Sequence, residues 1–277
     1  MIRRASIPGR INIIGEHTDY AGGCSLAFAS PHRLILEADF NHPTIEGDDT
    51  VVALWREAGG TPAKLSVQSS IPIGKGMSSS AALCLAIALC VNGPKLEKQA
   101  ACLEAQRLEH TVLGTPCGLL DQMAMMHAQA DHCTLIDFTL LTTSSIPYPS
   151  TWMFKLIDTG IHRMLNTHDY RDTTTQEIKQ QHVENENARV HQAMNASKEQ
   201  LGQLLNESHA SLRNIGVSTP EVDEQVHAIQ KMDGVLGARM MGGGFGGMIL
   251  VLVDDADVLP EQDVLIASSS GFVEEIL

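Results

Sequence analysis

Three polar side chains stand within four positions of each other, directly after a short apolar stretch near the start of the chain. Residues 10–14 predict a strand that ends at Gly15, and Glu16, His17 and Asp19 follow it. Carboxylates accept hydrogen bonds and an imidazole can accept or donate one, so this turn could bind a polyhydroxylated ligand. On the residues alone, an ordinary polar surface turn stays an alternative. A metal site is less favoured, because the turn has one histidine and no further cluster at ligand spacing.

A second segment, residues 72–82, is rich in glycine and serine and leads directly into an apolar stretch that predicts a buried helix over 79–91. Glycines let backbone N–H groups approach a phosphate, and a helix N-terminus adds unpaired donors and a favourable dipole. The serines could cap the helix, or place a hydroxyl on Mg²⁺ or a phosphate oxygen. This is not a Walker loop, since Gly76 follows Lys75, and it contains no Gly-x-Ser-x-Gly nucleophile elbow. A phosphate loop and a simple capped helix start both stay open.

A third segment, residues 237–247, contains six glycines. Gly242, Gly244 and Gly247 satisfy the pattern Gly-x-Gly-x-x-Gly, but a dinucleotide fingerprint must follow a strand and open a helix. Here an apolar strand, residues 248–253, comes after the glycines, so the context excludes that fingerprint. We expect a loop that packs closely against a ligand or against another backbone.

Helices and strands alternate irregularly around these segments, which predicts an α+β fold. Further strands are predicted at 34–40, 65–71, 134–138 and 153–157, further helices at 98–113 and over the polar stretch 173–215, and a turn-rich region with one apolar patch (51–55) at 41–64. The Ser-, Thr- and Pro-rich stretch 142–149 predicts a boundary between two lobes. We therefore expect an N-terminal lobe over 1–149 and a C-terminal lobe over 150–277.

Composition limits the classes of function. The chain has 277 residues, enough for a substantial core, with 33 acidic and 19 basic side chains and a net charge of −14. This balance argues against a nucleic-acid partner, because phosphate neutralisation needs Lys and Arg. It would also repel an anionic substrate unless the binding pocket were locally cationic.

The chain shows no targeting or membrane segment and no zinc motif. No apolar run approaches the roughly 20 residues of a membrane helix, so we expect a cytoplasmic protein without a membrane partner. The six cysteines lack Cys-x-x-Cys spacing and predict reduced, mostly buried thiols. Six of the twelve histidines lie in 162–227, where a solvated helical face is the favoured interpretation.

In this order, the three segments resemble the motifs of the GHMP small-molecule kinases, and residues 9–23 look like the signature of the galactokinase branch. Residues 72–82 resemble the family's ATP phosphate loop, and 237–247 its third motif. Residues 109–122 are similar to the stretch with the catalytic aspartate, and 158–170 to the segment whose tyrosine touches the sugar. The resemblance implies a two-lobed GHMP kinase fold, with an N-terminal ribosomal-protein-S5-like lobe and a C-terminal ferredoxin-like α/β lobe.

The resemblance also implies roles for individual residues. Asp121 would accept the proton of the sugar's anomeric hydroxyl, and Arg10 beside it would keep it ionised and stabilise charge on the transferring phosphoryl group. Ser80 and Glu109 would hold Mg²⁺. The implied ATP-binding residues are Gly74, Gly76, Ser78, Ser79 and Ser80, and the implied sugar-binding residues are Glu16, His17, Asp19, Gly118 and Tyr170.

The function implied is ATP-dependent phosphorylation of D-galactose to galactose 1-phosphate. Two alternatives stay open: a kinase for another sugar, such as L-arabinose or a modified hexose, and a catalytically silent sugar sensor with this fold. The intact run Glu16–Tyr20 favours galactose, and the presence of both Arg10 and Asp121 weighs against a sensor. The region 41–64 is short for the family, which leaves the nucleotide preference open, and the sequence is silent on oligomeric state.

Overall fold

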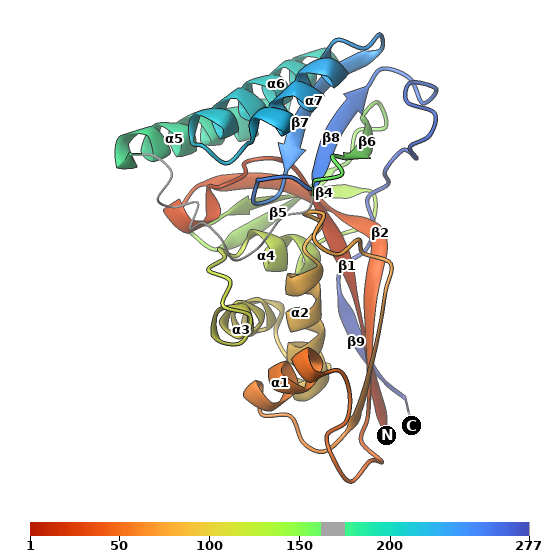
Figure 1. Cartoon of the computed structure of the whole chain (residues 1–277). Coiled ribbons are helices and arrows are strands. Elements are labelled where there is room, and N and C mark those ends of the chain that lie inside the picture. The colour runs from red at the N-terminus through yellow and green to blue at the C-terminus, as the bar shows by residue number, and fades with distance from the viewer. Residues whose placement is uncertain (162–174, 277) are drawn as a thin grey trace.

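The computed structural model describes residues 1–161 and 175–276 (Figure 1). A six-stranded antiparallel sheet has the order β5-β4-β2-β1-β9, with β3 beside β2. Its strands are β1 (Ile2–Ile14), β2 (Cys24–Asp39), β3 (Lys64–Ser69), β4 (His132–Asp137), β5 (Thr142–Pro147) and β9 (Phe272–Ile276). Every residue of β1 from Ala5 to Ile14 is buried, because both faces of this part of the strand are covered.

Four helices cover one face of this sheet (Figure 1): α1 (Asp49–Glu57), α2 (Ser79–Asn92), α3 (Lys98–Thr111) and α4 (Leu120–Met126). The central helix α2 is apolar on nearly all sides and buries a run of Ala, Leu, Ile and Cys side chains. Its N-terminus follows the serine-rich segment, so the burial of α2 fixes where that segment lies.

A three-stranded antiparallel sheet, β6-β8-β7, forms the second layer: β6 (Met153–Asp158), β7 (Val235–Met241) and β8 (Met248–Val253). Helices α6 (Lys198–Asn214) and α7 (Pro220–Gln230) pack against β7, and α5 (Gln176–Ala193) lies beside α6 and contacts β1 and β2 (Figure 1). One hydrophobic cluster runs from α2 through β1 and β2 to Leu250 and Leu252 of β8, so the two sheets share a core.

Most predicted elements are present, some of them longer than expected. Residues 10–14 and 34–40 belong to the long strands β1 and β2, and the buried helix at 79–91 is α2. The polar span 173–215 is two helices, α5 and α6, separated before the capping box that Ser197 forms with Gln200. Its first two residues lie outside the described part of the chain.

Three expectations need comment. The patch 51–55 is not an isolated apolar stretch but the buried side of helix α1, which Asp48 caps through the Thr50 N–H. The predicted boundary stretch 142–149 contains strand β5, which pairs with β4. The division into 1–149 and 150–277 stays a prediction; strand β9, near the end of the chain, pairs with β1 in the first sheet.

All six cysteines are free, and four of them are buried: Cys84, Cys90, Cys102 and Cys133. Among the described residues, no helix is both long and apolar enough to cross a membrane.

Candidate active site

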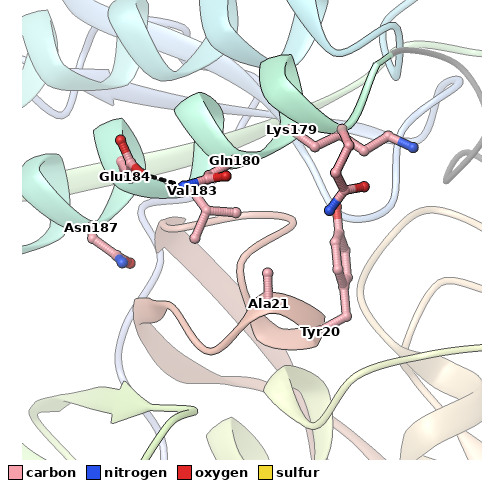
Figure 2. Close-up of a pocket in the computed structure, with 8 residues that line it drawn as sticks. Tyr20, Ala21, Lys179, Gln180, Val183, Glu184 and Asn187 are labelled. Atoms are coloured by element: carbon pink, nitrogen blue, oxygen red, sulfur yellow. Dashed lines mark hydrogen bonds between the residues drawn. The ribbon is translucent and has the colours of Figure 1, made fainter.

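A cavity of about 540 Å³ brings together residues from the three glycine-rich segments. Its wall includes Arg10, Glu16, His17, Asp19, Gly74, Gly76, Ser78, Ser79, Ser80, Glu109, Gly118, Asp121 and Gly243. These include every residue that the sequence assigns to the site except Tyr170, which lies outside the described residues. A second cavity, of about 640 Å³, lies between Tyr20 and Ala21 and the first turns of α5 (Figure 2). That larger cavity shares only Tyr20 with the first among the described lining residues.

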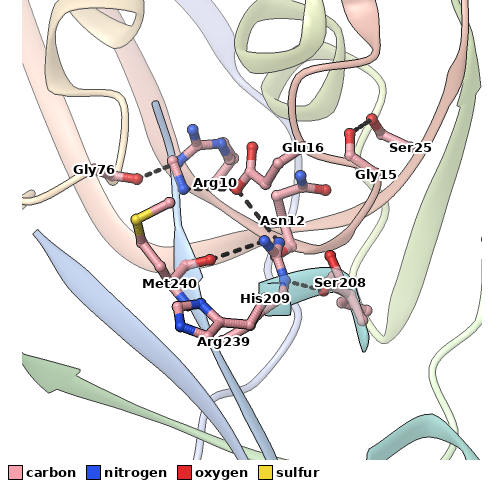
Figure 3. Close-up of polar contacts among 12 residues, drawn as sticks. Arg10, Asn12, Gly15, Glu16, Ser25, Gly76, Ser208, His209, Arg239 and Met240 are labelled. Atoms are coloured by element: carbon pink, nitrogen blue, oxygen red, sulfur yellow. Dashed lines mark hydrogen bonds and ion pairs between the residues drawn. The ribbon is translucent and has the colours of Figure 1, made fainter. Parts of the chain in front are cut away.

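Arg10 connects the aspartate of α4 to the serine-rich loop. Its Nε lies 2.9 Å from Oδ1 of Asp121, and its Nη1 donates to the carbonyl of Gly76 (Figure 3). The Arg10 side chain is 5% exposed, whereas Asp121 keeps 27% of its side-chain surface exposed in the cavity wall. A buried guanidinium thus stands between a reachable carboxylate and the loop before α2.

The serine-rich loop turns through left-handed backbone at Gly74, Gly76 and Ser78, with φ values of 71°, 77° and 63°. Ser78 is the residue before α2, but its side chain makes no capping hydrogen bond, and its buried Oγ has no partner within the described structure. The capped helix start is therefore absent, and the Ser78 hydroxyl and the first N–H groups of α2 are left for a ligand.

The third glycine segment packs against this loop, backbone to backbone. A Cβ at Gly242 would lie 3.1 Å from both Cα and O of Gly76, and one at Gly76 would lie 2.9 Å from the carbonyl of Met241. Gly242 also has a φ of 85°, which favours glycine. The expected close approach to another backbone is confirmed, and it occurs in the turn between β7 and β8.

The completely buried Arg239 joins the first segment to the third. It donates from Nε to the Ile13 carbonyl at 2.7 Å and from Nη2 to the Asn12 carbonyl at 2.6 Å, and Nη2 lies 3.3 Å from Oε1 of Glu16 (Figure 3). That Glu16 oxygen also accepts from the Gly242 N–H at 2.6 Å. Burial alone would raise the pKa of Glu16, but Arg239 and Arg10 hold it below its ordinary value.

Arg239 is not among the residues predicted from the sequence. Its only signal was a single cation within the otherwise uncharged stretch that forms β7. Its partners are backbone carbonyls more than 200 positions away in the chain, and no local pattern announces them.

Asp19 and Gly118 meet at the opposite wall. Oδ2 of Asp19 accepts from the Leu120 N–H at 3.3 Å, and a Cβ at Gly118 would lie 2.0 Å from the same oxygen. Burial raises the pKa of Asp19 to about 6, and the nearby carboxylates of Asp121 and Glu16 add to that shift. His17, with a left-handed φ of 57°, places its ring edge-on to Tyr20 at 6.1 Å between centroids.

Helix α5 holds the first segment and the start of β2 through hydrogen bonds. His182 Nε2 lies 2.9 Å from the Glu16 carbonyl, Glu186 accepts from the Gly15 N–H at 3.1 Å, and Asn187 accepts from the Cys24 N–H at 2.7 Å. The expected solvated face is therefore wrong for His182, and also for His209, which is buried beside Arg239 (Figure 3). Burial lowers the pKa of both imidazoles.

Glu109 is the buried carboxylate nearest the helix start. It is 2% exposed, the Ser80 hydroxyl hydrogen-bonds it, and no cationic side chain pairs with it within the described residues. Burial, followed by the charge of Asp121, raises the pKa of Glu109 to about 7. A hydroxyl and a carboxylate beside a phosphate loop are the oxygen donors that Mg²⁺ takes, so Ser80 and Glu109 fit this cation.

Comparisons with known proteins agree with this geometry. Three family models match: the galactokinase galactose-binding signature over residues 4–39, the GHMP kinases N terminal domain over 46–129 and the GHMP kinases C terminal over 190–262. The galactokinase of Thermotoga maritima is 33% identical to this chain, over 90% of this chain and 89% of that protein. The galactokinase of Thermosipho africanus is 30% identical, over 90% and 88%.

Solved structures of similar fold include two small-molecule kinases. The galactokinase of Lactococcus lactis, solved with galactose, superimposes with a TM-score of 0.85 at 23% identity, covering 98% of this chain and 94% of that one. The mevalonate kinase of Methanococcus jannaschii gives a TM-score of 0.75 at 18% identity, covering 94% of each chain. The predicted GHMP kinase fold of this chain is therefore confirmed.

Proposed function

Since the chain belongs to the galactokinase family of the GHMP kinases, we propose that it transfers the γ-phosphoryl group of ATP to the anomeric hydroxyl of D-galactose, giving galactose 1-phosphate and ADP. The observation that carries this proposal is the bridge that Arg10 makes between Asp121 and Gly76. It brings a carboxylate that can take a proton next to a loop that can hold phosphates.

The chemistry follows from this arrangement. Asp121 accepts the proton of the anomeric hydroxyl, and the sugar oxygen forms a bond to the γ-phosphorus while the bond from that phosphorus to the β–γ bridging oxygen breaks. ADP leaves with the electron pair of that bond. Arg10 holds the Asp121 carboxylate in place and lies where negative charge spreads over the transferring group.

The serine-rich loop receives the triphosphate. The left-handed turns at Gly74 and Gly76 expose backbone N–H groups, and Ser78, Ser79 and the N-terminus of α2 add donors. Arg10 and these donors make the pocket locally favourable to an anion, although the net charge of the whole chain is negative.

Ser80 and Glu109 are the residues we assign to a bound Mg²⁺. The cation would neutralise charge on the ATP phosphates. The raised pKa of Glu109 reflects a buried carboxylate without a cationic side chain, which is what a divalent cation would relieve.

The sugar occupies the wall formed by Asp19, His17 and Gly118, with Glu16 at its edge. Asp19 offers a carboxylate to sugar hydroxyls, and the absent side chain at Gly118 leaves the Asp19 carboxylate in place. Tyr170 stays a prediction from the resemblance, and a cytoplasmic location stays a prediction from the sequence.

A substrate panel tests the proposal. ADP release should be measured with Mg²⁺, ATP and, in turn, D-galactose, L-arabinose, N-acetylgalactosamine, glucose and mevalonate. We expect the highest kcat/KM with D-galactose. Faster turnover of another sugar would identify a different sugar kinase, and galactose binding without turnover of any of the compounds would identify a sensor.

A further inference from the structure

Two side chains, neither with a role so far, hold the same oxygen of Glu109. Gln122 donates from Nε2 to Oε2 of Glu109 at 2.5 Å, and the thiol of Cys117 donates to that oxygen with Sγ at 3.4 Å. The two holders also contact each other, with 3.6 Å between Gln122 Nε2 and Cys117 Sγ. One carboxylate oxygen therefore has two donors that come from outside its own helix.

Burial makes this arrangement specific. Gln122 is completely buried, and its Oε1 has no partner within the described structure, so its amide group is held on this side by the bond to Glu109. Cys117 is half-buried and is the only one of the six cysteines that lines the catalytic cavity. The orientation of the buried Gln122 amide is therefore set by the contacts of its Nε2 with Glu109 and Cys117.

The position of Gln122 in the chain connects the proposed base, Asp121, with the proposed cation ligand, Glu109. It follows Asp121 directly in the first turn of α4, while Glu109 lies near the end of α3 and Cys117 in the connection between the helices. Successive residues of a helix point in different directions, so this turn directs Asp121 towards Arg10 and Gln122 towards Glu109.

We propose that Gln122 and Cys117 are positioning residues of the cation site: they engage Oε2 of Glu109, so that the other carboxylate oxygen would be available to a cation held by Glu109 and Ser80. This inference rests on the proposed function, because it takes Glu109 as a cation ligand. Neither residue touches a substrate in this account. Both act by fixing the orientation of a ligand carboxylate, as hydrogen-bond partners of metal ligands commonly do.

A purely structural role for the two residues predicts a different outcome. Loss of either side chain would then lower the melting temperature but leave cation affinity unchanged once the protein is folded. The measurement must therefore report cation binding separately from turnover, and must include a variant that keeps the donor.

The test uses Mn²⁺ as the cation, with its free concentration followed by electron paramagnetic resonance in the presence of ADP. We expect Gln122→Leu to raise the Kd of Mn²⁺ by about 10–100-fold, the range typical for loss of a hydrogen-bond partner of a metal ligand. Cys117→Ala should raise it by about 3–10-fold, because a thiol is a weaker donor, while Cys117→Ser, which keeps a donor, should stay within about threefold of wild type. The Kd of galactose, measured by calorimetry without metal, should stay unchanged throughout.

Gln230→Leu is the matched control, since its amide donates to the Ala238 carbonyl at 2.9 Å, away from the cavity. It should leave the Kd of Mn²⁺ unchanged. If Gln122→Leu does not fold, the comparison of Cys117→Ala with Cys117→Ser decides.

Wild-type Mn²⁺ affinity in Cys117→Ala and in every folded Gln122 variant, alongside normal wild-type turnover, would overturn the inference. Failure of the wild type itself to phosphorylate galactose would instead contradict the proposed function.

Discussion

A methyl group at Gly118 should disturb the sugar site without touching the nucleotide site. A Cβ at this position would lie 2.0 Å from Oδ2 and 2.2 Å from Cγ of Asp19. The backbone of Gly118 does not lie in the left-handed region, so alanine fits its φ and the collision is the main effect of Gly118→Ala.

The size of the effect follows from the distances. Ordinary contact for a Cβ begins at 3.4 Å, so the Asp19 carboxylate or the start of α4 must move by about 1.4 Å, the difference between 3.4 and 2.0 Å. Such a shift would break the 3.3 Å hydrogen bond from the Leu120 N–H to Asp19. A misplacement of about 1 Å can cost about 100-fold in rate, so we expect kcat/KM for galactose to fall by about that factor.

The assay is initial-rate kinetics with galactose and ATP varied separately. The KM for ATP should change less than about threefold, because the substitution does not displace the serine-rich loop. Gly114→Ala is the matched control: its Cβ would meet nothing within 4 Å, but its φ of 65° imposes backbone strain of about 1–2 kcal/mol. It should lose stability and keep kcat/KM. An unchanged kcat/KM for galactose in Gly118→Ala would refute the reasoning, as would equal losses in both variants.

Further predictions concern three residues, Asp19, Arg239 and Gly242. Because Asp19 has a pKa of about 6 when folded, its carboxylate is lost below that pH, and the KM for galactose should rise about tenfold per pH unit in acidic assays. The raised pKa also means that ionised Asp19 costs stability above pH 6, so Asp19→Asn should raise the melting temperature at pH 8 while weakening galactose binding; a lower melting temperature would contradict this. Arg239→Met leaves Glu16 buried without its guanidinium and should cost about 3–5 kcal/mol in urea unfolding, partly recovered by adding Glu16→Gln; no recovery would argue against the ion pair as the cause. Gly242→Ala strains a φ of 85° and presses on Gly76, so ATP affinity in a fluorescent-nucleotide titration should fall about 3–10-fold with galactose affinity kept, and a loss confined to galactose would be inconsistent with the packing.

Local sequence patterns were enough to single out the two loops of the candidate site that contain Glu16–Asp19 and residues 72–82. The glycine and serine positions indicated either a phosphate loop or a capped helix start, because the backbone freedom of glycine and the capping ability of serine are visible in the residue types. The run Glu16–Asp19 indicated hydroxyl binding, with an ordinary polar turn as the alternative, because its carboxylates and imidazole are hydrogen-bonding groups. That these segments, with Asp121, line one cavity came from the resemblance, since no spacing in a single sequence shows that Arg10 reaches α4.

The site residues that the sequence did not predict have partners that are distant in the chain. Arg239, His182 and Glu186 meet the first segment from more than 160 positions away, and each looks like an ordinary polar residue of its own helix or strand. The local pattern predicts a solvated face for the histidines, because the stretch that forms α5 is polar on most sides. Tertiary burial overrides that local pattern, and the buried His182 keeps a hydrogen-bond partner in the Glu16 carbonyl.

Helix α1 and strand β5 were missed for a different reason. Each is short, and each has a composition that also suits a turn: a polar stretch with one apolar patch for α1, and Ser, Thr and Pro for β5. An edge strand of such residues is defined by its pairing with β4 and not by its own pattern.

The most direct test of the account is the product formed by the wild type and by Asp121→Asn from D-galactose and ATP with Mg²⁺. Phosphorus NMR and ADP release should show one galactose 1-phosphate per ADP for the wild type. Asp121→Asn should lose kcat by about 10²–10⁴-fold while it binds galactose and ATP with near wild-type affinity. Near-normal turnover by Asp121→Asn, or a wild type that forms no sugar phosphate, would contradict it.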